Sequence, residues 1–138
     1  MSVAAGASSP SVAFGTQRPI VVITSGEPAG VGPELCLRIV ERDWPVRLVV
    51  LGDIELMRAR AAALGSSVRV VPFDAAVAAV PGTVEVIHHG LARPSLPGQL
   101  DPANGAYVLR LLDDAIEGCM SARFAAMVTA PVHKGVIC

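Results

Sequence analysis

The chain has 138 residues, of which 52% are hydrophobic and 17% charged, so its composition is that of a globular protein and not of a disordered one. A formal net charge of −1 without a basic cluster argues against nucleic acid and anionic membranes as partners. No apolar run approaches the roughly eighteen residues that a membrane-spanning helix needs. The three cysteines, Cys36, Cys119 and Cys138, show no metal-ligand spacing, so we expect reduced thiols in a cytoplasmic protein.

The spacing of apolar residues predicts alternating strands and helices after a short leader. Residues 1–17 are small, polar and aperiodic, and they lack the basic start and apolar core of a secretory signal, so we expect a disordered leader. Continuous β-branched runs predict buried strands, and apolar stripes at helical spacing predict amphipathic helices. The expected strands are residues 19–25, 46–52, 67–73, 82–89 and 124–130, and the expected helices are 33–43, 53–65 and 104–122.

This order of elements favours an α/β fold, with a parallel sheet and helices on both faces. Asp53 is the expected N-cap of the second helix and Gly65 its C-cap, while Pro33 suits the first position of the first helix. A helix should follow the last strand in this architecture, and it would start about where the sequence stops. We therefore expect the 138 residues to be part of a longer protein.

Two loops follow strands and should open on the carboxyl edge of the sheet, where open α/β sheets bind ligands. The first, residues 25–34, reads SGEPAGVGPE and lacks the Lys-Ser/Thr pair of a P-loop. A dinucleotide fingerprint is also disfavoured, because Leu35 stands at its third glycine position and Asp53 is equally explained as a helix cap. Gly26, Gly30 and Gly32 would allow unusual backbone conformations and a close approach by a ligand.

Acidic residues in the first loop have two interpretations. Glu34 fits a residue that stabilises the positive end of a helix dipole, whereas Glu27, rigidly placed before Pro28, fits that account less well. A tight turn without any ligand remains an equally weighted alternative for this loop.

The second loop, residues 129–135, brings Thr129, His133 and Lys134 together at a strand end. Lys134 is the only lysine among eleven basic residues, which indicates a site that requires a compact ammonium group. His133 could be a base, a ligand or an ordinary loop histidine. His88 and His89 should face opposite sides of a strand and therefore not share a metal, and Asp113 and Asp114 are expected on the solvated side of the long helix.

Three segments in this order resemble the 4-hydroxythreonine-4-phosphate dehydrogenases. They are VVITSGEPAGVGPEL, PGQLDPANGAYVLRLLDDAIEGC and FAAMVTAPVHKGVI, and the resemblance extends over residues 18–137. It implies an isocitrate/isopropylmalate dehydrogenase-like α/β fold, of which residues 18–138 would form the N-terminal part. It further implies a cytoplasmic homodimer with active sites at the subunit contact.

The resemblance also implies a reaction and its cofactors. The family oxidises 4-phosphohydroxy-L-threonine with NAD or NADP and a divalent metal (Zn, Mg or Co), and the keto acid decarboxylates to 3-amino-2-oxopropyl phosphate in vitamin B6 biosynthesis. Gly26, Glu27, Gly30, Gly32, Thr129, His133 and Lys134 would then form the substrate or cofactor edge.

The sequence departs from the family pattern because the family's three metal-binding histidines lie beyond residue 138. No catalytic or metal-binding residue is therefore assigned, and we expect the isolated 138-residue chain to be inactive and to bind neither metal nor NAD(P). Two alternatives stay open, namely a sibling dehydrogenase of phosphorylated four-carbon hydroxy acids (erythronate or threonate phosphate) and a non-catalytic α/β binding module.

Overall fold

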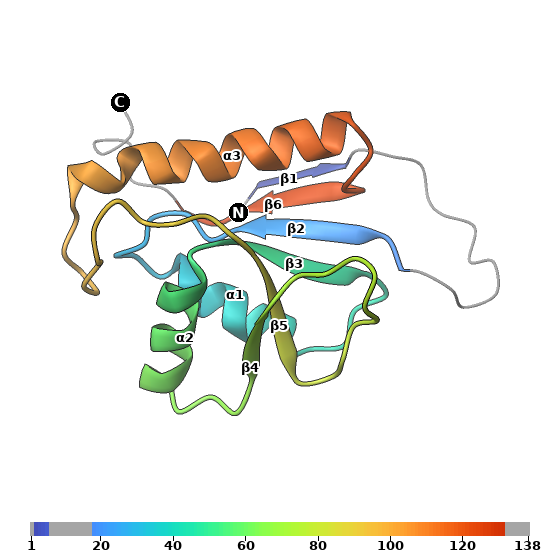
Figure 1. The fold of residues 1–138 in the computed structure, drawn as a ribbon, viewed down its shortest axis with the longest axis horizontal. Helices are drawn as coiled ribbons and strands as arrows, with labels where there is room; N and C mark the ends of the chain where they lie inside the picture. The colour runs from blue at the N-terminus through green and yellow to red at the C-terminus, as the bar shows by residue number, and fades with distance from the viewer. Residues whose placement is uncertain (1, 6–17, 132–138) are drawn as a thin grey trace.

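A computed structural model describes residues 2–5 and 18–131 of the chain, which form one sheet covered by helices (Figure 1). Apart from the first strand and a 3-10 turn, which were not expected, the elements follow the order predicted from the sequence, with boundaries that differ by a few residues. They are β1 (Ser2–Ala5), β2 (Ile20–Thr24), α1 (Gly32–Val40), β3 (Arg47–Gly52), α2 (Ile54–Ala63), β4 (Arg69–Pro72), β5 (Thr83–His88), a 3-10 turn (Pro102–Asn104), α3 (Gly105–Met120) and β6 (Ala126–Thr129).

The sheet has the strand order β1-β6-β2-β3-β5-β4. Every pairing among β2 to β6 is parallel, which confirms the parallel sheet predicted from the buried apolar runs. The exception is β1, which pairs antiparallel with β6. This strand lies inside the segment expected to be a disordered leader, and the remainder of that segment, residues 6–17, is outside the described residues. Its pairing occupies the outer edge of β6, whose backbone groups would otherwise lack strand partners.

Alternate residues of the central strands pack against different helices, so the sheet is buried on both faces. Val22, Val49 and Leu51 join the cluster beneath α3, whereas Ile23 and Val50 join the cluster beneath α1 and α2. Figure 1 shows the same division, with α3 on one side of the sheet and α1 and α2 on the other. This arrangement confirms the prediction of helices on both faces and explains the lack of polar alternation in these strands.

The ends of α2 are set by the residues that the sequence predicted. The carboxylate of Asp53 accepts a hydrogen bond from the backbone N–H of Leu56 at 2.9 Å, as an N-cap does. Gly65 follows the helix with a φ of +65°, the left-handed conformation in which glycine ends helices. Among the helices of residues 18–131, none is long and apolar enough to cross a membrane.

Candidate functional site

Strands β2 and β6 are neighbours, and their carboxyl ends bring the two predicted loops together. Thr24 pairs with Thr129 in the register, and the N–H of Ala130 donates to the carbonyl oxygen of Thr24 at 3.0 Å. One step further, the N–H of Glu27 donates to the carbonyl oxygen of Pro131 at 3.1 Å. The shared edge predicted for the loops is therefore confirmed as far as Pro131. His133 and Lys134 lie outside the described residues.

Two loop glycines are required by the chain's own packing. Gly26 has a φ of +73°, and a Cβ there would stand 2.3 Å from the carbonyl oxygen of Pro131. A Cβ on Gly32 would stand 1.9 Å from the carbonyl oxygen of Ser25. The close approach that the glycines were expected to offer a ligand is made at these two positions by the protein backbone. Gly30 is less constrained, since its Cβ would lie 3.4 Å from the nearest atom, the carbonyl oxygen of Glu27.

Glu27 is a buried acid, only 4% exposed, at the centre of this loop. One carboxylate oxygen, Oε1, accepts from the N–H of Ala29 at 3.2 Å. The other, Oε2, is buried and has no hydrogen-bond partner among the described residues, and the same holds for the hydroxyl of Thr24 on the adjoining strand. Buried polar atoms are nearly always paired, so an acceptor of this kind suits a donor group supplied from elsewhere.

A hydrogen-bonded network anchored by Tyr107 joins the ends of β2 and β3. The fully buried phenol oxygen accepts from the N–H of Asp53 at 2.9 Å and lies 3.3 Å from the hydroxyl of Ser25. Burial raises the pKa of Tyr107 to about 12 and outweighs the opposing effect of its hydrogen bonds with Ser25 and Asp53, so the phenol stays protonated. The network fixes the residue that opens the glycine-rich loop.

Asp53 has no free carboxylate oxygen with which to bind a ribose. Oδ1 accepts from Leu56, and Oδ2 accepts from the N–H of Leu91 at 2.9 Å. This pairing confirms the helix-cap interpretation over the dinucleotide one, and it also ties the loop after β5 to the same edge of the sheet.

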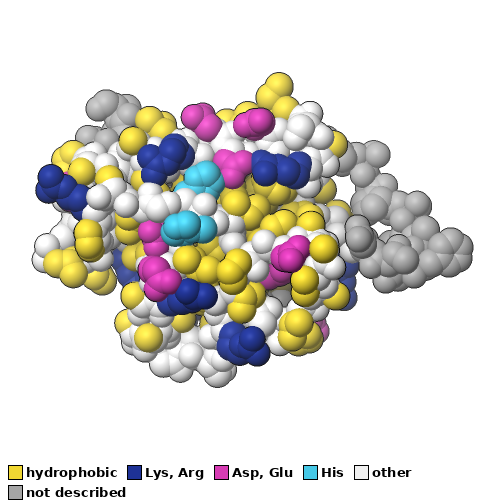
Figure 2. All heavy atoms as spheres, viewed as in Figure 1, with side chains coloured by type: hydrophobic (Ala, Val, Ile, Leu, Met, Phe, Trp, Pro, Cys, Tyr) yellow, Lys and Arg dark blue, Asp and Glu magenta, His cyan; other side chains and the backbone are white. Residues whose placement is uncertain are grey.

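The histidines at the end of β5 have separate structural roles. The Nδ1 atom of His88 accepts from the N–H of Ile54 at 3.1 Å, while Nε2 of His89 lies 2.8 Å from Oδ2 of Asp114 on α3. Figure 2 shows two histidine patches on this face, set between acidic and basic side chains. Among residues 18–131, no group of three or more His, Cys, Asp or Glu side chains could hold a metal ion.

Asp114 is only partly exposed, whereas the sequence predicted a solvated position on the helix. Burial disfavours its charged form, but hydrogen bonds from His89 and Arg123 outweigh that effect and hold the pKa of the carboxyl below its ordinary value of 3.8. The helical period placed Asp114 on the polar side of α3 correctly, but it could not show that β5 and the turn after α3 supply partners for that side.

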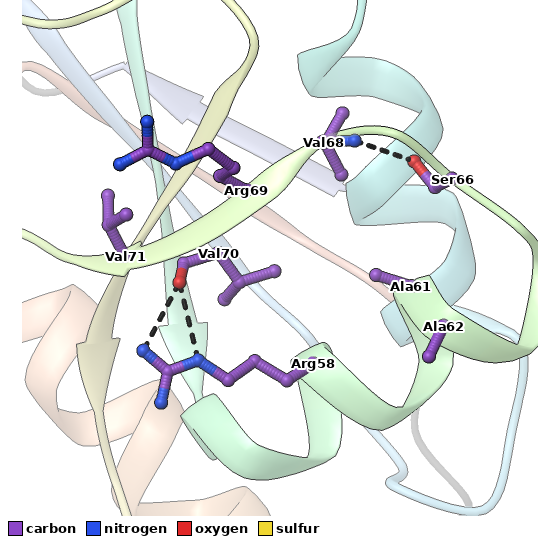
Figure 3. A pocket seen from close by; sticks show the side chains of 8 residues that line it. All are labelled: Arg58, Ala61, Ala62, Ser66, Val68, Arg69, Val70 and Val71. Carbon is purple, nitrogen blue, oxygen red and sulfur yellow. Dashed lines mark hydrogen bonds between the residues drawn. The ribbon is translucent and has the colours of Figure 1, made fainter.

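Two surface hollows lie away from this edge. One, of about 490 Å³, is an open depression between α2 and β4, where Arg58 donates to the carbonyl oxygen of Val70 (Figure 3). A second, of about 660 Å³, lies at the amino ends of β2 and β3, beside Trp44 and the ion pair of Arg47 with Glu85. Neither hollow is lined by a predicted site residue.

The site also contains a residue that the sequence reasoning missed. Arg60 of α2 is 4% exposed and donates to carbonyl oxygens of the glycine-rich loop. The sequence did offer one signal for Arg60, which stands between two alanines of the helix. Arg58 already provides a solvent-facing charge on this helix, so a second arginine suggests a different role.

Comparisons with known proteins agree with the resemblance of the three segments. The chain is 58% identical over 120 residues to a 4-hydroxythreonine-4-phosphate dehydrogenase of Azoarcus sp. (strain BH72), a match that covers 87% of this chain and 36% of the relative. It is 60% identical over 119 residues to the protein of that name from Aromatoleum aromaticum, covering 86% and 36%. A crystal structure of a 4-hydroxythreonine-4-phosphate dehydrogenase from Burkholderia phymatum superposes with a TM-score of 0.79 and 28% identity, covering 88% of this chain and 39% of that one.

The chain thus spans a little over a third of the length of these relatives. The sequence model of a pyridoxal phosphate biosynthetic protein family, PdxA, matches residues 44–138, which include β3 through β6 of the fold described above. On this match and these identities, the chain belongs to the PdxA family of pyridoxal phosphate biosynthetic proteins.

Proposed function

We propose that the chain is the N-terminal α/β part of a dehydrogenase that oxidises 4-phosphohydroxy-L-threonine in vitamin B6 biosynthesis. The observation that carries the proposal is the identity of 58% over 120 residues to a relative named for this activity. The secondary alcohol would lose a hydride and its hydroxyl proton, and the keto acid would then release CO₂ and take up a proton to give 3-amino-2-oxopropyl phosphate. The cytoplasm and a homodimer are part of the same proposal.

The glycine-rich loop would form one wall of the active site. Gly26 and Gly32 hold the backbone against Pro131 and Ser25, while Gly30 leaves room beside Glu27. Oε2 of Glu27, which has no hydrogen-bond partner among the described residues, would accept a hydrogen bond from a donor group of substrate or cofactor. Thr129 lies at the strand end beside this loop, and we place His133 and Lys134, outside the described residues, near the substrate or cofactor phosphates.

The two cofactors of the proposed reaction fit the described residues to different degrees. NAD or NADP would supply the hydride acceptor, and Oε2 of Glu27, without a partner in residues 18–131, is compatible with a donor-bearing group at this edge. A divalent ion such as Zn, Mg or Co does not fit, because the described residues contain no cluster of ligands for it. We assign these residues no step that involves a metal.

The assay that tests the proposal is NADH or NADPH formation by the intact gene product with 4-phosphohydroxy-L-threonine, NAD(P) and a divalent metal. We expect absorbance growth at 340 nm that requires all three additions. Activity with erythronate or threonate phosphate, and none with 4-phosphohydroxy-L-threonine, would identify the protein as a sibling dehydrogenase. A folded product that oxidises none of these compounds would favour a non-catalytic binding module.

A further inference from the structure

Arg60 buries a charged guanidinium against the glycine-rich loop. Its side chain projects from α2, and its NH1 and NH2 atoms donate to the carbonyl oxygens of Gly30 at 3.1 Å and Pro28 at 2.5 Å. The nearest carboxylate oxygen, Oε1 of Glu34, is 3.5 Å away, at the limit of a hydrogen bond. Backbone carbonyls therefore provide most of the polar environment of this cation.

The three successive carbonyls of the loop turn are all occupied by other parts of the fold. Arg60 takes the first and the third, those of Pro28 and Gly30, and the N–H of Gly98 donates to the one between them, that of Ala29, at 2.8 Å. The turn is thus held from two sides, by α2 and by the loop that follows β5. The planar fork of N–H donors of an arginine suits two carbonyls separated by one residue better than a lysine ammonium does.

The held turn carries Glu27. The N–H of Gly30 donates to the carbonyl oxygen of Glu27 at 3.0 Å, and the N–H of Ala29 donates to its carboxylate. Both donors belong to the segment whose carbonyls are fixed by Arg60. A buried guanidinium is costly unless its donors are satisfied, and an alanine at this position of an alanine-rich helix would avoid that cost.

We propose that Arg60 is a positioning residue, which sets the conformation of the Pro28–Gly30 turn and through it the orientation of the Glu27 carboxylate. This role concerns the loop itself and does not depend on which substrate the full protein uses. It predicts that loss of the Arg60 guanidinium increases local opening of the Pro28–Gly30 turn without an equal increase in the sheet.

Amide hydrogen exchange on the ¹⁵N-labelled 138-residue chain tests this role, with Ala29 and Gly30 as reporters and the β3 amides as reference. In Arg60→Met we expect exchange at the reporters to rise about tenfold or more relative to β3, because the local opening no longer breaks two charged hydrogen bonds. Arg60→Lys should give a smaller rise, since the charge is kept and the fork is lost. The carboxyl ¹³C resonance of Glu27 should shift in both variants.

Arg58→Met is the matched control, because Arg58 lies on the same helix but bonds to Glu55 and β4 instead of the loop. It should leave the ratio of loop to β3 exchange and the Glu27 resonance unchanged. A rise in Arg60→Met that merely parallels β3 would show a general stabilising role, and no rise would show that Arg60 does not hold the turn; either result would overturn the proposal. If Arg60→Met does not fold, Arg60→Lys decides by the same ratio, with Arg58→Lys as its control.

Discussion

Replacing Gly32 by alanine should destabilise the protein, while the same change two residues earlier, at Gly30, should not. The two positions share one loop, and an added Cβ removes the same amount of backbone freedom from the unfolded chain at each. They differ in the room available. The Cβ of the first variant would stand 1.9 Å from the carbonyl oxygen of Ser25, and that of the second 3.4 Å from its nearest neighbour.

The size of the effect follows from this contact. Real Cβ atoms essentially never approach another heavy atom within 3.0 Å, so the turn between β2 and α1 must move by about 1 Å. Displacements of this kind in packed regions cost about 1–3 kcal/mol. Alanine returns at most about 1 kcal/mol through its helix propensity, because Gly32 is the first residue of α1. We expect Gly32→Ala to be about 2 kcal/mol less stable than Gly30→Ala.

Urea unfolding followed by far-UV circular dichroism, with fluorescence of the single tryptophan, Trp44, as a second probe, measures both variants. Gly30→Ala should stay within about 1 kcal/mol of the parent chain. Equal free energies of unfolding for the two variants would refute the close packing of Gly32 on Ser25, and with it the claim that the glycines of this loop serve the chain's own backbone.

Three further predictions concern the buried groups. Tyr107→Phe should lower the free energy of unfolding by about 1–3 kcal/mol, because the N–H of Asp53 loses its buried acceptor; an unchanged urea midpoint would contradict this. The carboxylate of Asp114, whose pKa is depressed, should contribute stability that is complete above its ordinary pKa of 3.8 and lost as the pH falls below that value. Urea titrations between pH 7 and 3 should therefore show a shallower acid loss in Asp114→Asn, and a slope equal to that of the parent would count against the ion pair. Burial raises the pKa of Cys36 to about 12, so a thiol reagent at pH 8 should label it only after unfolding. Peptide mass spectrometry would measure this labelling, and labelling of the native chain at the rate of a free peptide would contradict the burial of Cys36.

The sequence was sufficient for the elements whose signal is local. Residues 48–51 are apolar at every position because both faces of the sheet are covered, and the cap at Asp53 depends only on the residues next to it. Strand β1 has no such signal, since four small residues become a strand only by pairing with β6, far along the chain. Its absence from the prediction reflects the non-local nature of sheet pairing.

The same distinction applies to the candidate site. The parallel order of the strands was enough to predict that residues 25–34 and 129–135 share an edge, and the hydrogen bond from Glu27 to Pro131 confirms this as far as residue 131. Sequence spacing could not show that Gly32 packs on Ser25 or that Arg60 reaches the loop from α2. The first depends on how α1 leaves the end of β2, and the second on how α2 lies beside the loop, and both arrangements are set by tertiary packing and not by a local pattern.

The most direct test of the proposed function is the activity of a chimera. Residues 18–138 of this chain would replace the matching segment of the Azoarcus relative, whose sequence is 58% identical over 120 residues. If this chain forms one wall of a dehydrogenase active site, the chimera should form NADH from 4-phosphohydroxy-L-threonine with a kcat/KM within about tenfold of the parent enzyme. A chimera that has the parent's size and melting temperature yet forms no NADH above the blank would contradict the account.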